Sequence, residues 1–326
     1  MQIALPLLLG LSVFLTGMKV MELALHQWAG SYLISLVERF TRTPLRGMLV
    51  GTGVTMVLQS SSAITVLTIG LVNAGIMTFP RTLGIILGTN IGTCITTELI
   101  GLNITSMGLP LIIMSAGVWI AALLPAIGRD QLPVALHRIL HHIRSLSLAA
   151  AGFGSILLGV EVMQSVVPAL QSRGLFGWFI DQAQRNAVWG VMAGAVLTAI
   201  IQSGTATIAM AMGLATVDAI PVELGIAIVL GANIGTCLTA FLASIGGTKS
   251  GVLVAWSHII LNAGGVLLFL PFLPQLHFVS ELMANSPSEQ IARAQTVFNI
   301  VCSLIALPIC YLPAMNKLGI SSGPRS

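Results

Sequence analysis

Long apolar stretches alternate with short polar segments along almost the whole chain. Seven of these stretches are close to the length of about 20 residues that a helix needs to cross a bilayer. The pattern therefore predicts seven membrane-spanning helices, at about residues 3–25, 83–103, 106–128, 146–170, 224–245, 251–273 and 291–313. After the first of them, residues 26–46 are amphipathic and include Trp28, so we expect a separate helix there at the membrane interface.

Two further apolar segments, at about residues 47–77 and 190–217, carry a polar cluster near their centre. Amides and hydroxyls are costly in lipid unless they face protein or a water-filled cavity. Backbone that is not helical is tolerated at membrane depth only where it lines such a cavity. Each segment is therefore predicted to form two half-helices joined as a re-entrant hairpin, with its tip near mid-membrane. The predicted tips are Gln59-Ser60-Ser61-Ser62 and Gln202-Ser203-Gly204-Thr205.

The chain contains an internal repeat. Residues 59–63 match residues 202–206, and Gly-Thr-Asn-Ile-Gly-Thr-Cys at 88–94 matches Gly-Ala-Asn-Ile-Gly-Thr-Cys with the same offset of 143. Upstream, residues 15–21 match residues 157–163 with an offset of 142. These three matches indicate a duplicated unit of helix, hairpin and helix. Three predicted crossings precede the second copy, so the copies are expected to be inverted, as in many secondary transporters.

The predicted fold class is an all-α polytopic membrane protein with two inverted repeats and about seven full spans plus two re-entrant helical hairpins. We expect the first repeat in residues 1–128 and the second in residues 145–273, with a cytoplasmic connection in residues 129–144. Residues 274–313 are expected to form the final span and residues 314–326 a cytoplasmic tail.

Composition narrows the class of protein further. Only 7% of the residues are charged and 56% are hydrophobic, whereas soluble domains carry about 25% charged residues. This excludes a soluble enzyme and a disordered chain. The net charge of +4 comes without basic patches and interleaved aromatics, so nucleic acid is not expected as a partner.

The positive charges predict the orientation in the membrane. Under the predicted topology, ten Lys and Arg residues fall on one side and three on the other. The side rich in Lys and Arg is expected to be cytoplasmic. This places the N-terminus outside and the C-terminus in the cytoplasm, in the cell (inner) membrane.

The polar clusters suggest what the protein binds. Hydroxyls, amides and the N–H groups of half-helix N-termini suit a small anion. Glycines on both sides of Asn90 and Asn233 are expected to let the helices unwind and free backbone carbonyls, which hold sodium in transporters. The predicted sodium ligands are Asn90, Thr93, Asn233 and Thr236. Anion donors beside cation ligands predict cation-coupled anion transport.

Gln-Ser-Ser-Ser followed by Gly-x-Asn-Ile-Gly-Thr, with a related pair in the second copy, resembles the type II sodium–phosphate cotransporter family. The resemblance is to its short bacterial form without a PhoU-like domain, and it covers Phe14 to about Ile309. It implies uptake of inorganic phosphate by alternating access, with no cofactor and with Na⁺ as the coupling ion. Gly204 departs from the family's serine. The implied substrate contacts are Gln59, Ser60, Ser61, Ser62, Gln202, Ser203, Gly204 and Thr205.

Other functions stay open at this point. Export of phosphate, or transport of another oxyanion such as sulfate or arsenate, would use the same site chemistry. An intramembrane enzyme would need a Ser–His pair or an HExxH motif, and neither accompanies the serine clusters. A channel is disfavoured, because closed hairpin tips in inverted copies suit alternating access. The sequence leaves the oligomeric state open.

Several polar residues also have purely structural interpretations. The serine clusters, and Asn90 and Asn233, could form hydrogen bonds between helices. Glu98 has no polar counterpart in the second copy and lies near the end of its span, where its carboxylate is expected to reach the interface. His258 and Asn262 lie four residues apart, and we expect both to form hydrogen bonds between helices.

Overall fold

The computed structural model describes residues 3–102, 104–126, 133–172 and 174–318. Every regular element in these residues is a helix, and seven helical segments are long and apolar enough to cross a membrane. Each overlaps one predicted span, so the all-helical fold and the number of candidate spans are confirmed. The segments are Ala4–Phe40, Phe79–Gly101, Thr105–Leu123, Val134–Gln171, Val222–Ser244, Lys249–Met283 and Pro287–Tyr311.

The expectation of a separate interfacial helix at 26–46 is wrong. Helix α1 (Ala4–Phe40) instead continues without a break through residues 26–40. Helix α2 (Pro44–Leu58) then starts after Thr43, whose side chain accepts a hydrogen bond from the backbone N–H of Arg46. The chain has no proline between the first turn of α1 and Pro44, so no residue of that kind ends α1 earlier.

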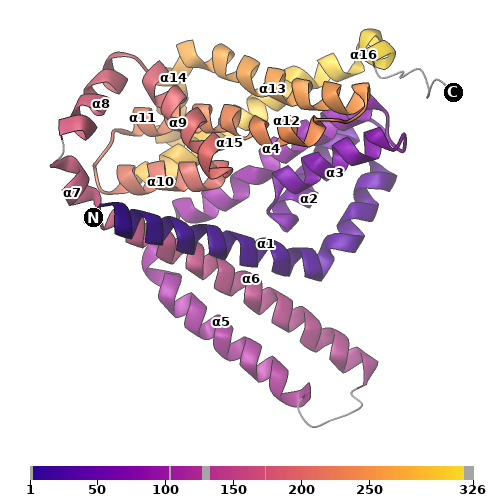
Figure 1. The fold of residues 1–326 in the computed structure, drawn as a ribbon, viewed down its shortest axis with the longest axis horizontal. Helices are drawn as coiled ribbons and strands as arrows, with labels where there is room; N and C mark the ends of the chain where they lie inside the picture. Colours follow the sequence, from indigo (N-terminus) through magenta and orange to yellow (C-terminus); the bar gives the residue numbers. More distant parts are fainter. Residues whose placement is uncertain (1–2, 103, 127–132, 173, 319–326) are drawn as a thin grey trace. The chain divides into compact units, whose positions relative to one another are not determined.

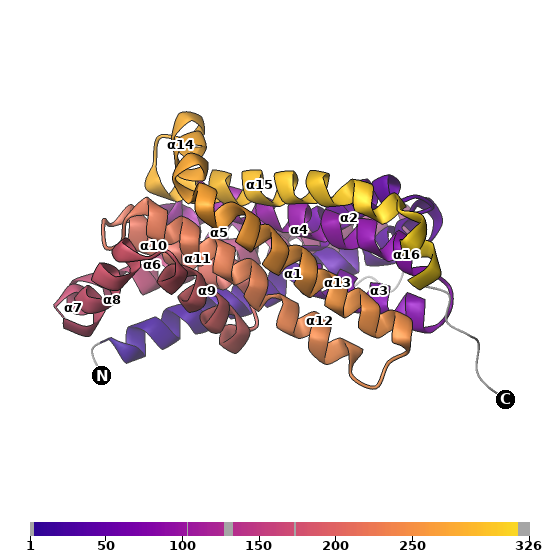
Figure 2. The ribbon, with the colours of Figure 1, turned by 90° about the horizontal axis from the view of Figure 1, so that it is seen from above.

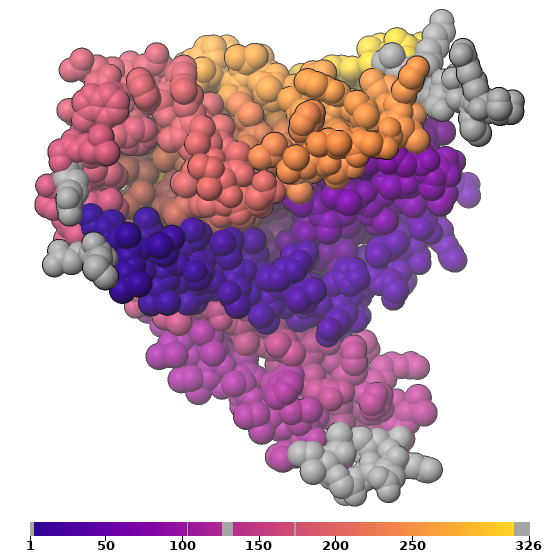
Figure 3. Space-filling model, in the orientation of Figure 1, coloured from indigo at the N-terminus to yellow at the C-terminus, as the bar shows by residue number. Residues whose placement is uncertain are grey.

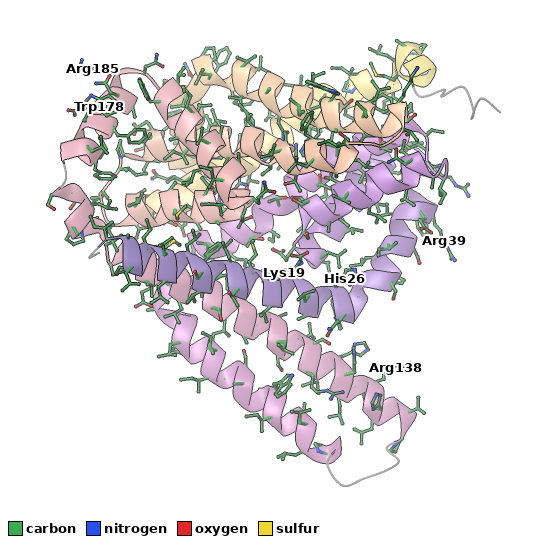
Figure 4. All side chains as sticks on the ribbon, in the orientation of Figure 1. Lys19, His26, Arg39, Arg138, Trp178 and Arg185 are labelled. Atoms are coloured by element: carbon green, nitrogen blue, oxygen red, sulfur yellow. The ribbon has the colours of Figure 1, made fainter. Side chains whose placement is uncertain are left out.

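The second copy differs from the first at this position. The stretch equivalent to residues 31–42 forms a separate helix, α8 (Gly174–Arg185). This short helix carries Trp178 and Arg185 (Figure 4), and the Trp178 ring packs edge-on against Trp189 at a centroid distance of 5.7 Å. The broken segment is therefore preceded by one long helix in the first copy and by a separate short helix in the second.

Two predicted connections are partly helical. Helix α6 (Val134–Gln164) includes residues 134–144 of the predicted 129–144 connection, while residues 129–132 lie outside the described part of the chain. Helix α16 (Pro313–Leu318) occupies the start of the predicted tail. The rest of that tail, residues 319–326, also lies outside the described residues.

The chain divides into two compact units, and each is built from two separate stretches. The first unit consists of Met1–Leu33 and Asn103–Arg173. It contains most of α1 with α5 (Gly108–Leu123), α6 and α7 (Val167–Gln171). Helices α5 and α6 lie side by side (Figure 1, Figure 3).

Within the first unit, α1 and α6 cross through glycines. A Cβ atom on Gly17 would lie 2.6 Å from the carbonyl oxygen of Gly152, and one on Gly10 would lie 2.9 Å from that of Gly159. Small residues permit such close approach of membrane helices. Because residue 10 meets 159 and residue 17 meets 152, the first helices of the two copies run antiparallel.

The second unit consists of Ile34–Leu102 and Gly174–Ser326. Figure 2 shows its helices closely layered. Besides α2, α8 and α16, they are α3 (Ser61–Asn73), α4 (Phe79–Gly101), α9 (Val188–Ile201), α10 (Gly204–Thr216), α11 (Val222–Gly235), α12 (Cys237–Ser244), α13 (Lys249–Phe269), α14 (Leu273–Met283) and α15 (Pro287–Ala306).

The second unit contains two matching helix pairs. Helix α2 packs on α4, and α9 packs on α11 (Figure 2). A Cβ atom on Gly92 would lie 2.6 Å from the carbonyl oxygen of Thr52, and one on Gly235 would lie 2.6 Å from that of Ala195. The repeated glycines therefore let each pair approach backbone to backbone.

Candidate functional site

Each broken segment is interrupted at a glutamine with a left-handed backbone. Gln59 follows α2 with φ 56° and ψ 25°, and Gln202 follows α9 with φ 62° and ψ 24°. The serine that comes next starts the following helix. Ser60 accepts a hydrogen bond from the backbone N–H of residue 63 at 3.3 Å, and Ser203 from that of residue 206 at 3.2 Å. We call these two positions, residues 59–60 and 202–203, the Gln-Ser breaks.

Each Gln-Ser break exposes the N-terminus of a helix. Helices α3 and α10 each have 13 residues and begin at Ser61 and Gly204. The N–H groups of the first helical residues have no partner within the helix, and the helix dipole adds a partial positive charge there. Each break therefore presents hydrogen-bond donors without a cationic side chain.

The two helix N-termini line one cavity. Its volume is about 30 Å³, enough for about two water molecules. Within the described part of the chain, none of the lining side chains is Asp, Glu, Lys or Arg. The predicted residues that line it are Ser61, Ser62, Asn90, Thr93, Gly204, Asn233 and Thr236. The remaining lining residues are Thr65, Ile208, Ala232, Thr239, Ala240, His258 and Gln295.

Five predicted substrate contacts do not line this cavity: Gln59, Ser60, Gln202, Ser203 and Thr205. Gln59 Nε2 donates to the carbonyl oxygen of residue 56 at 2.5 Å, and Gln59 Oε1 accepts from the hydroxyl of residue 96. Gln202 Nε2 donates to the carbonyl oxygen of residue 199 at 3.2 Å. Ser60 and Ser203 are the helix caps. Four of the five therefore have hydrogen bonds that fix the shape of the breaks.

The predicted unwinding at Asn90 is wrong. Helix α4 runs through Asn90 without interruption, because the flanking glycines serve the packing against α2 rather than a break. In the second copy, α11 and α12 are separated only at Thr236. The backbone carbonyl of Asn233 is engaged there, since it accepts from the Thr236 hydroxyl at 2.8 Å and from Asn262 Nδ2 at 2.8 Å. Side-chain oxygens are therefore the cation ligands that these segments still offer.

A hydrogen bond between helices uses part of the hydrogen-bonding capacity of the Asn90 side chain. Asn90 Nδ2 donates to Asn262 Oδ1 at 2.6 Å, which joins α4 to α13. The same Asn262 donates to α11, so the expected hydrogen bonds of Asn262 are confirmed. Asn90 therefore both forms a hydrogen bond between helices and lines the cavity.

The close approach of Thr236 explains why residue 204 is a glycine. A Cβ atom on Gly204 would lie 2.7 Å from Thr236 Cγ2. A serine at this position would need Thr236 to shift, so the departure from Gln-Ser-Ser-Ser brings the N-terminus of α10 nearer to α11. The second copy thus has one hydroxyl fewer at its break.

Sequence reasoning missed two buried polar residues of the cavity, His258 and Gln295. His258 is 6% exposed, and neither of its ring nitrogens has a hydrogen-bond partner among the described residues. Its expected hydrogen bond between helices is therefore wrong. Gln295 is 2% exposed and lies on α15, outside the duplicated core. The detectable signal was the shared spacing of His258 with Asn262 and of Gln295 with Asn299.

Glu98 has a partner that the sequence did not suggest. Its carboxylate forms an ion pair with Arg293 and accepts a hydrogen bond from the Thr296 hydroxyl. The Glu98 side chain is 16% exposed and that of Arg293 is 36% exposed. Neither residue lines the cavity, so the pair joins α4 to α15 and supports a structural role for Glu98.

Matched helix breaks around an uncharged polar cavity, in a multi-pass helical protein, are features of membrane transport proteins. The Na⁺/Pi-cotransporter family matches residues 13–165 and 155–284, so each match contains one copy of the duplicated core. The chain belongs to this family, which confirms the resemblance drawn from the motifs. The family is one of transporters and not of enzymes.

The chain is similar to individual bacterial proteins over most of its length. The chain is 31% identical to the uncharacterized protein YqeW of Bacillus subtilis over 300 residues, which cover 92% of each chain. It is 24% identical to the "Putative inorganic phosphate export protein YjbB" of Escherichia coli over 308 residues, which cover 93% of this chain and 53% of YjbB. The chain thus spans about half the length of YjbB.

A third relative is eukaryotic. Sodium-dependent phosphate transport protein 2A of Rattus norvegicus is 33% identical over 101 residues, or 30% of this chain and 16% of that protein. No solved structure matches the chain significantly.

Proposed function

We propose that the protein is a secondary active transporter that couples sodium entry to the uptake of inorganic phosphate. Phosphate would bind in the cavity between the Gln-Ser breaks. The observation that carries this proposal is the convergence of two equivalent helix N-termini, at Ser61 and Gly204, on one cavity without charged side chains. Helix N-termini bind phosphate groups through free N–H donors.

Sodium would supply the positive charge that the side chains lining the cavity do not. Asn90, Thr93, Asn233 and Thr236 line the same cavity, and each has a side-chain oxygen, the ligand type that hard cations prefer. Moving one net negative charge inward against 100 mV costs about 2.3 kcal/mol. Two or more sodium ions would offset this cost for a divalent anion, which is the physical reason to couple the two.

Alternating access between inverted repeats is the proposed mechanism. The antiparallel crossing of α1 and α6 supports inversion, because these are equivalent helices of the two copies. The breaks at Gln59 and Gln202 fit re-entrant hairpins whose tips meet at mid-membrane. In such a mechanism the two copies would open the cavity between them to one side of the membrane at a time.

The membrane location and orientation are part of the proposal. The excess of Lys and Arg on one side of the predicted topology supports an outside N-terminus and a cytoplasmic C-terminus in the cell membrane.

Export of phosphate is the second candidate function. It is favoured by the name of YjbB, to which this chain is similar over about half of YjbB's length. The same cavity would serve either direction, because gradients set the direction of a secondary transporter.

Transport by purified protein in proteoliposomes tests the proposal. We expect radiolabelled phosphate to enter faster with sodium outside than with choline, and Ser61→Ala and Asn233→Ala to reduce that uptake at equal expression. Ser172→Ala, an exposed serine outside the cavity, is the matched control. Equal uptake in sodium and in choline would reject coupling, and wild-type uptake by both cavity variants would reject the site. Release from loaded vesicles without uptake would favour export.

A further inference from the structure

Two helices outside the broken segments contact the duplicated core in the same way. Asn299 on α15 donates to the sulfur of Cys94 at 3.3 Å, and Asn262 on α13 donates to the sulfur of Cys237 at 3.3 Å. Cys94 and Cys237 occupy equivalent positions in the two copies. Helices α13 and α15 are therefore structural counterparts, although the repeat in the sequence does not align them.

The equivalence extends to the residue one turn before each asparagine. The thiol of Cys237 lies 3.6 Å from the carbonyl oxygen of His258, and that of Cys94 lies 3.9 Å from the carbonyl oxygen of Gln295. Both His258 and Gln295 line the cavity, and both are more than nine-tenths buried. Each of the two equivalent helices, α13 and α15, thus contributes one polar side chain to the lining of the cavity.

The two side chains keep hydrogen-bonding capacity that the protein does not use. Both ring nitrogens of His258 are without a partner among the described residues. Gln295 Oε1 accepts from the Thr97 hydroxyl at 2.5 Å, and its Nε2 group donates no hydrogen bond within the described residues. An unpaired buried polar group lowers stability. A ligand in the cavity that both residues line is the partner available to them.

We propose that His258 and Gln295 are a mirrored pair of substrate contacts, and that His258 selects oxyanions that carry a proton, phosphate and arsenate, over sulfate. The inference rests on the proposed function and adds a specificity to it. A neutral imidazole has one donor and one acceptor nitrogen. Monohydrogen phosphate satisfies both, because it has acceptor oxygens and a P–OH donor, whereas sulfate at neutral pH has only acceptors.

Gln295 has a different role in the same site. Its amide nitrogen only donates, so it serves phosphate and sulfate equally. Loss of Gln295 should weaken the binding of both anions, while loss of His258 should also remove the discrimination between them. This difference separates a direct contact by His258 from a general disturbance of the cavity.

Binding of radiolabelled phosphate to the purified full-length protein in sodium chloride at pH 8, with competition by arsenate and sulfate, tests the inference. For the wild type we expect arsenate to compete about as well as phosphate and sulfate to compete at least about tenfold less well. His258→Leu should bind phosphate about tenfold more weakly and lose the preference over sulfate. Gln295→Leu should bind more weakly but keep the preference. His277→Leu, outside the cavity, is the control.

The outcomes distinguish the two proposals. A wild type that binds no phosphate would overturn the proposed function itself. A wild type that binds phosphate while His258→Leu keeps wild-type affinity and preference would overturn only the role of His258. If His258→Leu does not yield monodisperse protein, His258→Phe carries the same expectation, because it keeps an aromatic ring without hydrogen-bonding nitrogens.

Discussion

Replacing Gly235 by alanine should destabilise the protein, because two backbones meet at this glycine. A Cβ atom on Gly235 would lie 2.6 Å from the carbonyl oxygen of Ala195 and 2.6 Å from Thr198 Cβ. Ordinary contact begins at 3.4 Å, so a shift of about 0.8 Å is needed. Neither obstructing atom is the end of a flexible side chain, and α9 must therefore move away from α11.

The expected cost follows from overpacking. Inserting a methyl group into a packed interior costs about 1–3 kcal/mol, while alanine in place of glycine gains up to about 1 kcal/mol in a helix. Gly53→Ala is the matched control, since a Cβ atom there would meet no atom within 4 Å. Both variants share the gain in helix propensity, so the difference between them isolates the overpacking of about 1–3 kcal/mol.

Thermal unfolding of the purified variants in detergent measures this difference. Gly235→Ala should unfold several degrees below Gly53→Ala, since 1 kcal/mol corresponds to about 2–4 °C for chains of 150–250 residues. Gly92→Ala, the equivalent change in the first copy, should behave like Gly235→Ala. Equal midpoints for Gly235→Ala and Gly53→Ala would refute the reasoning that these glycines set the distance between the helices.

Two further predictions concern the breaks and the ion pair. Gln202 has φ 62°, where glycine is favoured and β-branched residues are strained, so Gln202→Val should lower the unfolding midpoint and Gln202→Gly should not; the opposite order would be inconsistent with a left-handed break. Arg293→Met should cost about 2 kcal/mol, less than for a fully buried pair, because the Arg293 side chain is 36% exposed. Adding Glu98→Gln should recover part of this loss, and simple additivity of the two changes would count against the pair.

Much of the candidate site followed from local sequence. A run of hydroxyls inside an apolar segment predicts the break whose tip includes Ser61 and Ser62. The repeat predicts Asn90 as a residue of the site, but its flanking glycines also predict local unwinding of the helix. They are packing positions instead, and a sequence pattern does not distinguish a glycine that bends a helix from one that lets a second helix approach.

Other members of the cavity required the packing of distant segments. Gln295 lies 63 positions beyond Ala232 in the chain, yet both line the same cavity. The sequence predicts a hydrogen bond between helices for His258, and only the surroundings of its ring show that it has no partner among the described residues. Neither residue lies in one of the three matched stretches that reveal the repeat.

The sequence by itself determined the seven spans, the duplicated core and the family, because apolar length and repeated motifs are properties of the chain. The tertiary structure decided that Ser61 and Gly204 face one cavity, and that His258 and Gln295 join them there. The physical reason is that contacts between helices depend on how closely their backbones approach, at positions such as Gly235, and on where buried polar groups find partners.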